Sequence, residues 1–106
     1  MLEEVSLGMV EEKRHTVHLD EDGRVIIEFA KPIKSFMYAT IFFGNVRGVE
    51  LMVGRKGKKE QVIGVRFESV EVLKLFHRVN GWPKDFNEVL AVIEDLQRKR
   101  KEHATS

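Results

Sequence analysis

The chain has no cysteine, and only two prolines, one tryptophan and one tyrosine among its 106 residues. Without cysteine it forms no disulfide, so nothing in the sequence favours an oxidising compartment, and we expect a cytoplasmic protein. No apolar run approaches the ~18 residues that a membrane span requires. The acidic opening Met1-Leu-Glu-Glu lacks the apolar core of a signal peptide. We therefore expect no membrane as a partner.

Charged residues make up 33 % of the chain and hydrophobic residues 42 %, enough for one modest core. The high charge, with few Asn and Gln, is typical of a thermophile. The chain shows no repeat and no linker, so residues 1–106 are expected to form a single domain. Residues 1–12 fit a helix or a strand, and 98–106 form a basic, partly flexible tail. The net charge of +1 conceals a distribution with acids near the N-terminus and bases at 55–59 and 98–101.

Alternating apolar residues predict strands in the first two thirds of the chain. Val17 and Leu19 alternate with polar residues, and Asp20-Glu-Asp-Gly23 predicts a turn before the next strand. Pro32 lacks an amide donor and marks a connection or an edge. The strands predicted after Leu19 are 24–29, 36–43, 49–53 and 61–67.

Two helices are predicted after the strands. Ser69 is a candidate N-cap for the first, which ends at Gly81-Trp82-Pro83. Asp85 begins the second, with Glu88 placed as in a capping box. One apolar stripe follows, formed by Phe86, Val89, Leu90, Ile93 and Leu96. This order predicts an α+β fold: an antiparallel β-sheet of four to five strands followed by two C-terminal helices packed on one face.

Residues suited to catalysis are few. His15 and His18 would point to opposite faces of a strand and are poor joint metal ligands. Asp20–Gly23 resembles a calcium loop, but Arg24 stands where an oxygen ligand is needed. The chain has no Walker loop and no dinucleotide fingerprint. We therefore expect no enzyme, no metal and no cofactor.

The most distinctive segment is the hairpin from Leu51 to Phe67. Its tip carries four cations beside Gly54 and Gly57, and they are Arg55, Lys56, Lys58 and Lys59. Such a tip gains from a polyanion, because neutralised phosphates release counterions. Arg47 and Arg66 would extend this track. The alternative is edge protection, since lysines and glycines keep sheets from pairing edge to edge.

The run 36–43 is the most aromatic in the chain. As a strand it would place Phe36, Tyr38 and Phe42 on one face with Thr40. That face is either a second buried layer or a platform for bases or a partner; stacking on such rings is worth ~1–3 kcal/mol per base. The opposite face would be a normal core face, formed by Met37, Ala39, Ile41 and Phe43. Trp82 is either a plug under the sheet or a partly exposed stacking residue.

The stripe from Phe86 to Leu96 packs on the sheet or pairs with a second copy. At this size the core is marginal and dimerisation is a common remedy, so we expect a homodimer.

The layout of strands, a Gly54-Arg55-Lys56-Gly57 segment and then helices resembles small single-stranded DNA-binding proteins. These are the Whirly and transcriptional-coactivator group, and the ThermoDBP-like proteins of thermophilic archaea. The coactivator group has a Gly-Arg-Lys-Gly segment in the sheet before its helix. Here another strand, 61–67, intervenes, and the last helix has no counterpart. The resemblance covers roughly residues 15–80 and implies single-stranded DNA, a dimer and no cofactor.

These observations together predict a non-catalytic, largely sequence-independent binder of single-stranded nucleic acid, with DNA favoured over RNA. The alternative is a protein–protein interaction or accessory module that uses the aromatic face or the C-terminal helix.

Overall fold

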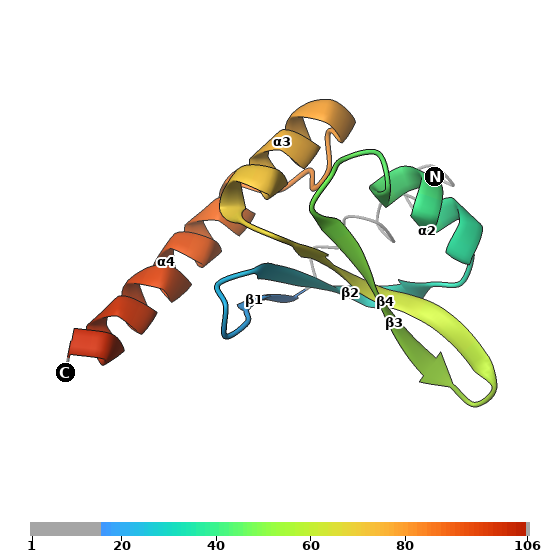
Figure 1. Cartoon of the computed structure of the whole chain (residues 1–106), viewed down its shortest axis with the longest axis horizontal. Helices are drawn as coiled ribbons and strands as arrows, with labels where there is room; N and C mark the ends of the chain where they lie inside the picture. Colours follow the sequence, from blue (N-terminus) through green and yellow to red (C-terminus); the bar gives the residue numbers. More distant parts are fainter. Residues whose placement is uncertain (1–15, 106) are drawn as a thin grey trace.

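The computed structural model describes residues 16–105, and the predictions for 1–12 and His15 lie outside them (Figure 1). The strands are β1 (Thr16–Leu19), β2 (Val25–Ile33), β3 (Val49–Lys56) and β4 (Lys59–Phe67). The helices are α2 (Phe36–Phe43), α3 (Val70–Asn80) and α4 (Phe86–Thr105). The four strands form one antiparallel sheet in the order β1-β2-β4-β3. The predicted α+β class is confirmed.

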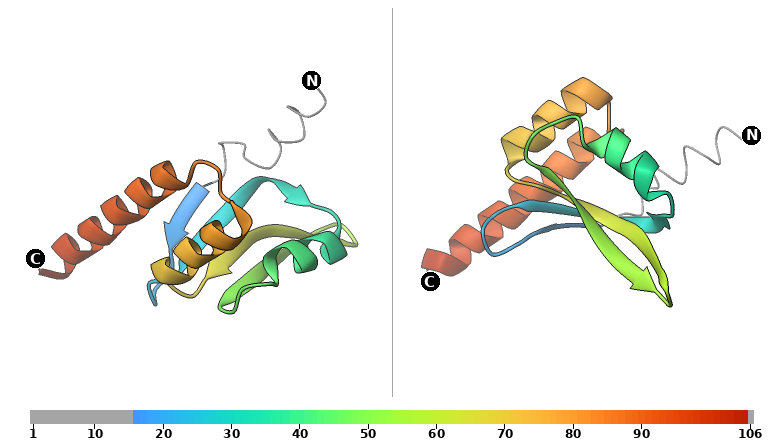
Figure 2. Two further views of the ribbon diagram at one scale, coloured as in Figure 1. Left: turned by 90° about the horizontal axis from the view of Figure 1, so that it is seen from above. Right: turned by 45° about the vertical axis from the view of Figure 1, so that its right-hand side comes forward.

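One face of the sheet is apolar and the other is polar. Rows of paired residues set this division: Leu19, Val25, Phe67 and Val49 form one row of the apolar face, and Val17, Ile27, Val65 and Leu51 the next. These side chains belong to one hydrophobic cluster with side chains of all three helices, which therefore cover this face (Figure 2). The opposite face carries polar pairs, including Arg66 with Glu50 and His18 with Glu28. Packing of the C-terminal helices on one face is thus confirmed.

The predicted strand 36–43 is wrong, because the segment is helix α2. Ser35 caps this helix: its hydroxyl accepts a hydrogen bond from the Tyr38 amide at 3.1 Å. Ala39 and Phe43, one helical turn apart, are buried against the sheet. Met37 and Ile41, expected in the core, are 72 % and 69 % exposed. Tertiary packing thus outweighs the β-propensity of the aromatic residues.

Helices α3 and α4 begin where the sequence predicts. The Ser69 hydroxyl accepts a hydrogen bond from the Val72 amide at 3.2 Å, and Gly81 ends α3 with a φ of 74°. Helix α4 follows Asp85 and runs beside β1, where Val89 and Ile93 are buried. The stripe therefore packs on the sheet of its own chain. No helix among residues 16–105 is both long and apolar enough to cross a bilayer.

The residues from 98 to 105 continue helix α4. The Arg100 guanidinium donates hydrogen bonds to the carbonyls of Asp20, at 2.8 Å, and of Leu19, at 3.5 Å. Arg98 and Lys99 form ion pairs with Asp95 on the preceding turn. The basic segment is thus a helical end, from which Arg100 contacts the β1–β2 turn.

Both predicted hairpin turns are confirmed. In the first, the Gly23 amide donates to the Asp20 carbonyl at 3.0 Å. The β3–β4 hairpin is longer than predicted: its strands extend to Lys56 and Lys59, which pair with each other. The turn is therefore only two residues long, and Gly57 takes the positive φ of 67° that such a turn requires at its first position.

Strand β2 leaves regular pairing near its end. Glu28 pairs with Gly64 and Ile33 with Val62, so five steps along β2 match two along β4. The extra residues form an irregular, bulged segment that includes Pro32. Among residues 16–105, no strand pairs with this segment on the β1 side, because the pairing of β1 with β2 reaches only to Glu28. Pro32 therefore lies inside strand β2 and not in a connection between strands, and its missing amide donor falls in the bulged stretch where regular pairing is interrupted.

Candidate functional site

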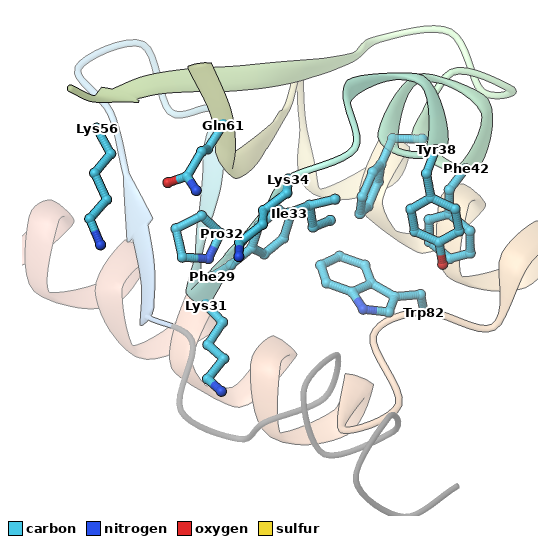
Figure 3. A pocket seen from close by; sticks show the side chains of 11 residues that line it. Phe29, Lys31, Pro32, Ile33, Lys34, Tyr38, Phe42, Lys56, Gln61 and Trp82 are labelled. Carbon is cyan, nitrogen blue, oxygen red and sulfur yellow. The ribbon is translucent and has the colours of Figure 1, made fainter. Parts of the chain in front are cut away.

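A pocket of about 770 Å³ lies where the end of β2, helix α2, the β3–β4 hairpin and the α3–α4 connection meet (Figure 3). Its lining residues are Phe29, Lys31, Pro32, Ile33, Lys34, Tyr38, Phe42, Phe43, Lys56, Gln61 and Trp82. These described residues include five aromatic side chains and three lysines, and none of them is a carboxylate. Aromatic and cationic side chains that the sequence keeps apart thus share one cavity.

The aromatic side chains contact one another in a continuous cluster. The Phe43 ring lies 5.2 Å from Trp82 in an edge contact and 5.8 Å from Phe29 in a stacked one. The Tyr38 and Phe42 rings, one helical turn apart, stack with centroids 6.1 Å apart. Trp82 is only 4 % exposed, whereas Tyr38 is 53 % exposed. The cluster therefore has a rigid buried base and an accessible aromatic ring at its rim.

The three lysines come from two separate segments. Lys31 and Lys34 flank Pro32 and Ile33 after the β2 bulge, and Lys56 ends β3 beside the hairpin turn. All three are exposed, and no carboxylate among residues 16–105 lies within ion-pair distance of them. In Figure 3, Lys56 and Gln61 lie at one end of the pocket and Tyr38, Phe42 and Trp82 at the other. The pocket thus has an aromatic end, and the three lysines lie along the rest of its lining.

Local structure explains why these side chains converge. The bulge in β2 turns Phe29 and Lys31 toward the pocket instead of leaving them in regular pairing. Helix α2 presents Tyr38 and Phe42 on one side because residues four apart lie on the same helical face. The short turn at Gly57 pairs Lys56 with Lys59 and Gly54 with Gln61, which puts Lys56 and Gln61 on the same face of the hairpin. Each wall of the pocket thus depends on a different backbone feature.

Four of the ten predicted site residues line this pocket: Tyr38, Phe42, Lys56 and Trp82. Lys58 and Lys59 are exposed at the hairpin tip, next to Lys56. Phe36 is 45 % exposed and lies outside the pocket, because in a helix it does not share a face with Tyr38. The predicted face of Phe36, Tyr38 and Phe42 is therefore wrong, although Tyr38 and Phe42 stay together.

The predicted arginines are not in the pocket. Arg47 lies in the turn before β3, and Arg66 lies near the end of β4, so both are at the opposite end of the hairpin from its tip. Arg66 is on the polar face, where its Nε donates to a Glu50 carboxylate oxygen at 2.9 Å and this hydrogen bond raises the pKa of Arg66. Arg55 lies 3.7 Å from the Glu60 carboxylate. Glu50 and Glu60 thus compensate two of the predicted cations.

Sequence reasoning missed Phe29, Lys31, Lys34 and Gln61 as site residues. Lys31-Pro32-Ile33-Lys34 carries a recognisable signal: two lysines flank a proline that interrupts a strand. A helical spacing in the run 36–43, with Ser35 before it and Gly44 after it, would have indicated that Tyr38 and Phe42 share a face.

A second exposed surface belongs to helix α2, which contains no charged residue. Met37 and Ile41, four residues apart, are its most exposed apolar side chains and lie outside the pocket lining. Among residues 16–105, no three His, Asp or Glu side chains gather as a set that could hold a metal ion.

Comparisons with protein-family models, with curated proteins and with solved structures found no match to this chain, so its function is argued from the site itself.

Proposed function

We propose that this protein is a non-catalytic, largely sequence-independent binder of single-stranded nucleic acid, with DNA favoured. The observation that carries the proposal is the pocket in which aromatic rings adjoin three lysines that pair with no carboxylate of residues 16–105. A single strand has unstacked bases, which suit the aromatic rings, and a regular row of phosphates, which suits the lysines. The DNA preference stays a prediction, because no residue of the pocket distinguishes a 2′-hydroxyl.

The hairpin supplies a surface for the backbone of the strand. Lys58 and Lys59 lie at its exposed tip and Lys56 faces the pocket, so the positive charge continues from tip to cavity. Each phosphate of a single strand that a lysine neutralises makes the slope of log affinity against log salt steeper by about 0.7, so that affinity falls as salt rises. This contact carries no sequence information, and the proposed binding is therefore largely independent of sequence.

The aromatic end of the pocket supplies a surface for bases. Tyr38 is half exposed at the rim, whereas Phe43 and Trp82 hold the base of the cluster in place. An aromatic ring stacks on any base face, and duplex bases are already stacked on each other. The proposed function therefore favours single strands over duplex.

The experiment compares Tyr38→Ala with Met37→Ala in titrations of a labelled oligo-dT. Both residues belong to α2 and are more than half exposed, but only Tyr38 lines the pocket. We expect Tyr38→Ala to weaken binding by ~1–3 kcal/mol, the value of one stacking platform. Met37→Ala is expected to leave affinity unchanged, and thermal melting is expected to show both variants folded.

An unchanged affinity in Tyr38→Ala would contradict stacking at this pocket, and no binding of oligo-dT by the unaltered protein at low salt would overturn the proposal. A melting temperature lowered by Tyr38→Ala, with normal binding by the folded fraction, would favour the interaction-module alternative.

The surface of α2 supports that second candidate, a protein-interaction module. Met37 and Ile41 present adjacent apolar side chains to solvent on a helix without charge. The proposed homodimer stays a prediction without an assigned contact, because the α4 stripe is buried within its own chain. The resemblance to small single-stranded DNA-binding proteins, which implies a dimer, stays a prediction.

A further inference from the structure

The pocket holds more positive charge than one internal nucleotide needs. Among residues 16–105, its lining contributes three lysines and no carboxylate. A phosphodiester within a strand carries a single negative charge, whereas a terminal phosphate monoester carries about −1.5 to −2 at neutral pH. Such a terminal group, with the adjoining phosphodiester, brings close to three negative charges to three lysines.

The arrangement of the lining also fits the end of a strand. Tyr38, Phe42 and Trp82 lie at one end of the pocket, and Lys56 with Gln61 lies at the other (Figure 3). A terminal nucleotide has the same polarity, with an apolar base on one side and its most charged phosphate on the other. The tip lysines, Lys58 and Lys59, lie outside the pocket and beside Lys56, where the rest of the strand would continue.

We propose that the pocket binds the phosphorylated end of a single strand, with the terminal base against Tyr38 and the terminal phosphate beside Lys31 and Lys56. This inference rests on the proposed function, because it names the part of the single strand that occupies the site. The proposed function alone predicts equal affinity for any stretch of a strand, whereas this inference predicts higher affinity for a phosphorylated end.

The experiment measures the affinity of three oligo-dT probes of equal length, labelled internally. One carries a 5′-phosphate, one a 3′-phosphate and one only hydroxyl ends. One extra charge neutralised on a single strand corresponds to about fivefold tighter binding at 0.1 M salt. We expect one of the two phosphorylated probes to bind about fivefold more tightly than the probe with only hydroxyl ends. Comparison of the 5′-phosphate with the 3′-phosphate probe then identifies which end of the strand enters the pocket.

Two double variants assign the preference to the pocket. Lys31→Gln/Lys56→Gln removes two lysines of the lining, and Lys58→Gln/Lys59→Gln removes two lysines outside it. Both change the net charge equally, and all four side chains are exposed, so the fold is expected to persist. The first double variant is expected to lose the fivefold preference. The second is expected to bind all probes more weakly and to keep it.

The outcomes separate this inference from the function on which it rests. If the unaltered protein binds the three probes equally, strand-end binding is wrong and the proposed function stands. If it binds none of them, both fail. If the tip variant loses the preference and the pocket variant keeps it, the terminal phosphate binds at the tip and the pocket assignment is wrong.

Discussion

The two basic runs of the chain, 55–59 and 98–101, each carry four cations and lie in different surroundings. The first forms the tip of the β3–β4 hairpin and the second belongs to the end of α4, at opposite ends of the molecule (Figure 1). At the end of α4, Arg98 and Lys99 pair with Asp95, and Arg100 binds the carbonyls of Leu19 and Asp20.

At the hairpin, Arg55 is close to Glu60, whereas no carboxylate of residues 16–105 pairs with Lys56, Lys58 or Lys59. Similar runs of cations therefore differ in the charge that they offer a ligand. Whether a cation is available to a ligand therefore depends on the carboxylates and carbonyls around it and not on the number of cations in the run. We infer that the α4 end contributes mainly to stability and the hairpin end mainly to binding.

The largest expected effect is on stability at the α4 end. Ile93 is fully buried between α4 and the sheet, so Ile93→Ala is expected to lower the free energy of unfolding by ~2–5 kcal/mol. The adjacent Val92 is 44 % exposed, and Val92→Ala is a matched control with an expected cost below ~1 kcal/mol. Urea unfolding measures both. Equal losses in the two variants would show that α4 does not anchor the fold through this face.

The next effect is on binding at the hairpin end. In Lys56→Gln/Lys58→Gln/Lys59→Gln, the slope of log affinity against log salt is expected to fall by about 2, from three contacts of about 0.7 each. At 0.1 M salt this corresponds to about 100-fold weaker binding of oligo-dT. The control, Arg98→Gln/Lys99→Gln/Lys101→Gln, removes the same net charge from α4. Equal losses in the two variants would mean that binding follows net charge, and the contrast between the two runs would disappear.

The smallest expected effect is on stability at low pH, and it arises from Asp20 in the β1–β2 turn that Arg100 contacts. Desolvation raises the pKa of Asp20, but hydrogen bonds from the amides of Arg24 and Asp22, together with the Arg24 charge, hold it below the ordinary 3.8. Because the folded pKa is the lower one, this stabilisation is present above about pH 4 and is lost as the pH falls through the folded pKa.

Unfolding monitored across that range measures the effect. Asp20→Asn is expected to reduce the loss of stability on acidification. If Asp20→Asn loses as much stability on acidification as the unaltered protein, other carboxylates cause the loss.

Local signals were sufficient for much of the fold. Helix α3 begins after Ser69 and ends at Gly81, as predicted. Both signals are local, because the capping hydroxyl and the glycine with positive φ each act within one turn of the helix. The α4 stripe and both hairpin turns were also read correctly from periodicity and glycine. For the site, the sequence identified Lys56, Tyr38, Phe42 and Trp82, but not that they share a cavity.

By itself, then, the sequence determined the strands, their turns and the two C-terminal helices, because each depends on residues close together in the chain. Only the tertiary structure decided that 36–43 is a helix, since its eight apolar and small residues fit a period of 2 as well as 3.6. The contacts of Phe43 with Phe29, Phe76 and Trp82 favour the helix. The pocket depends on the same long-range contacts, because its walls come from segments between Phe29 and Trp82 that only folding brings together.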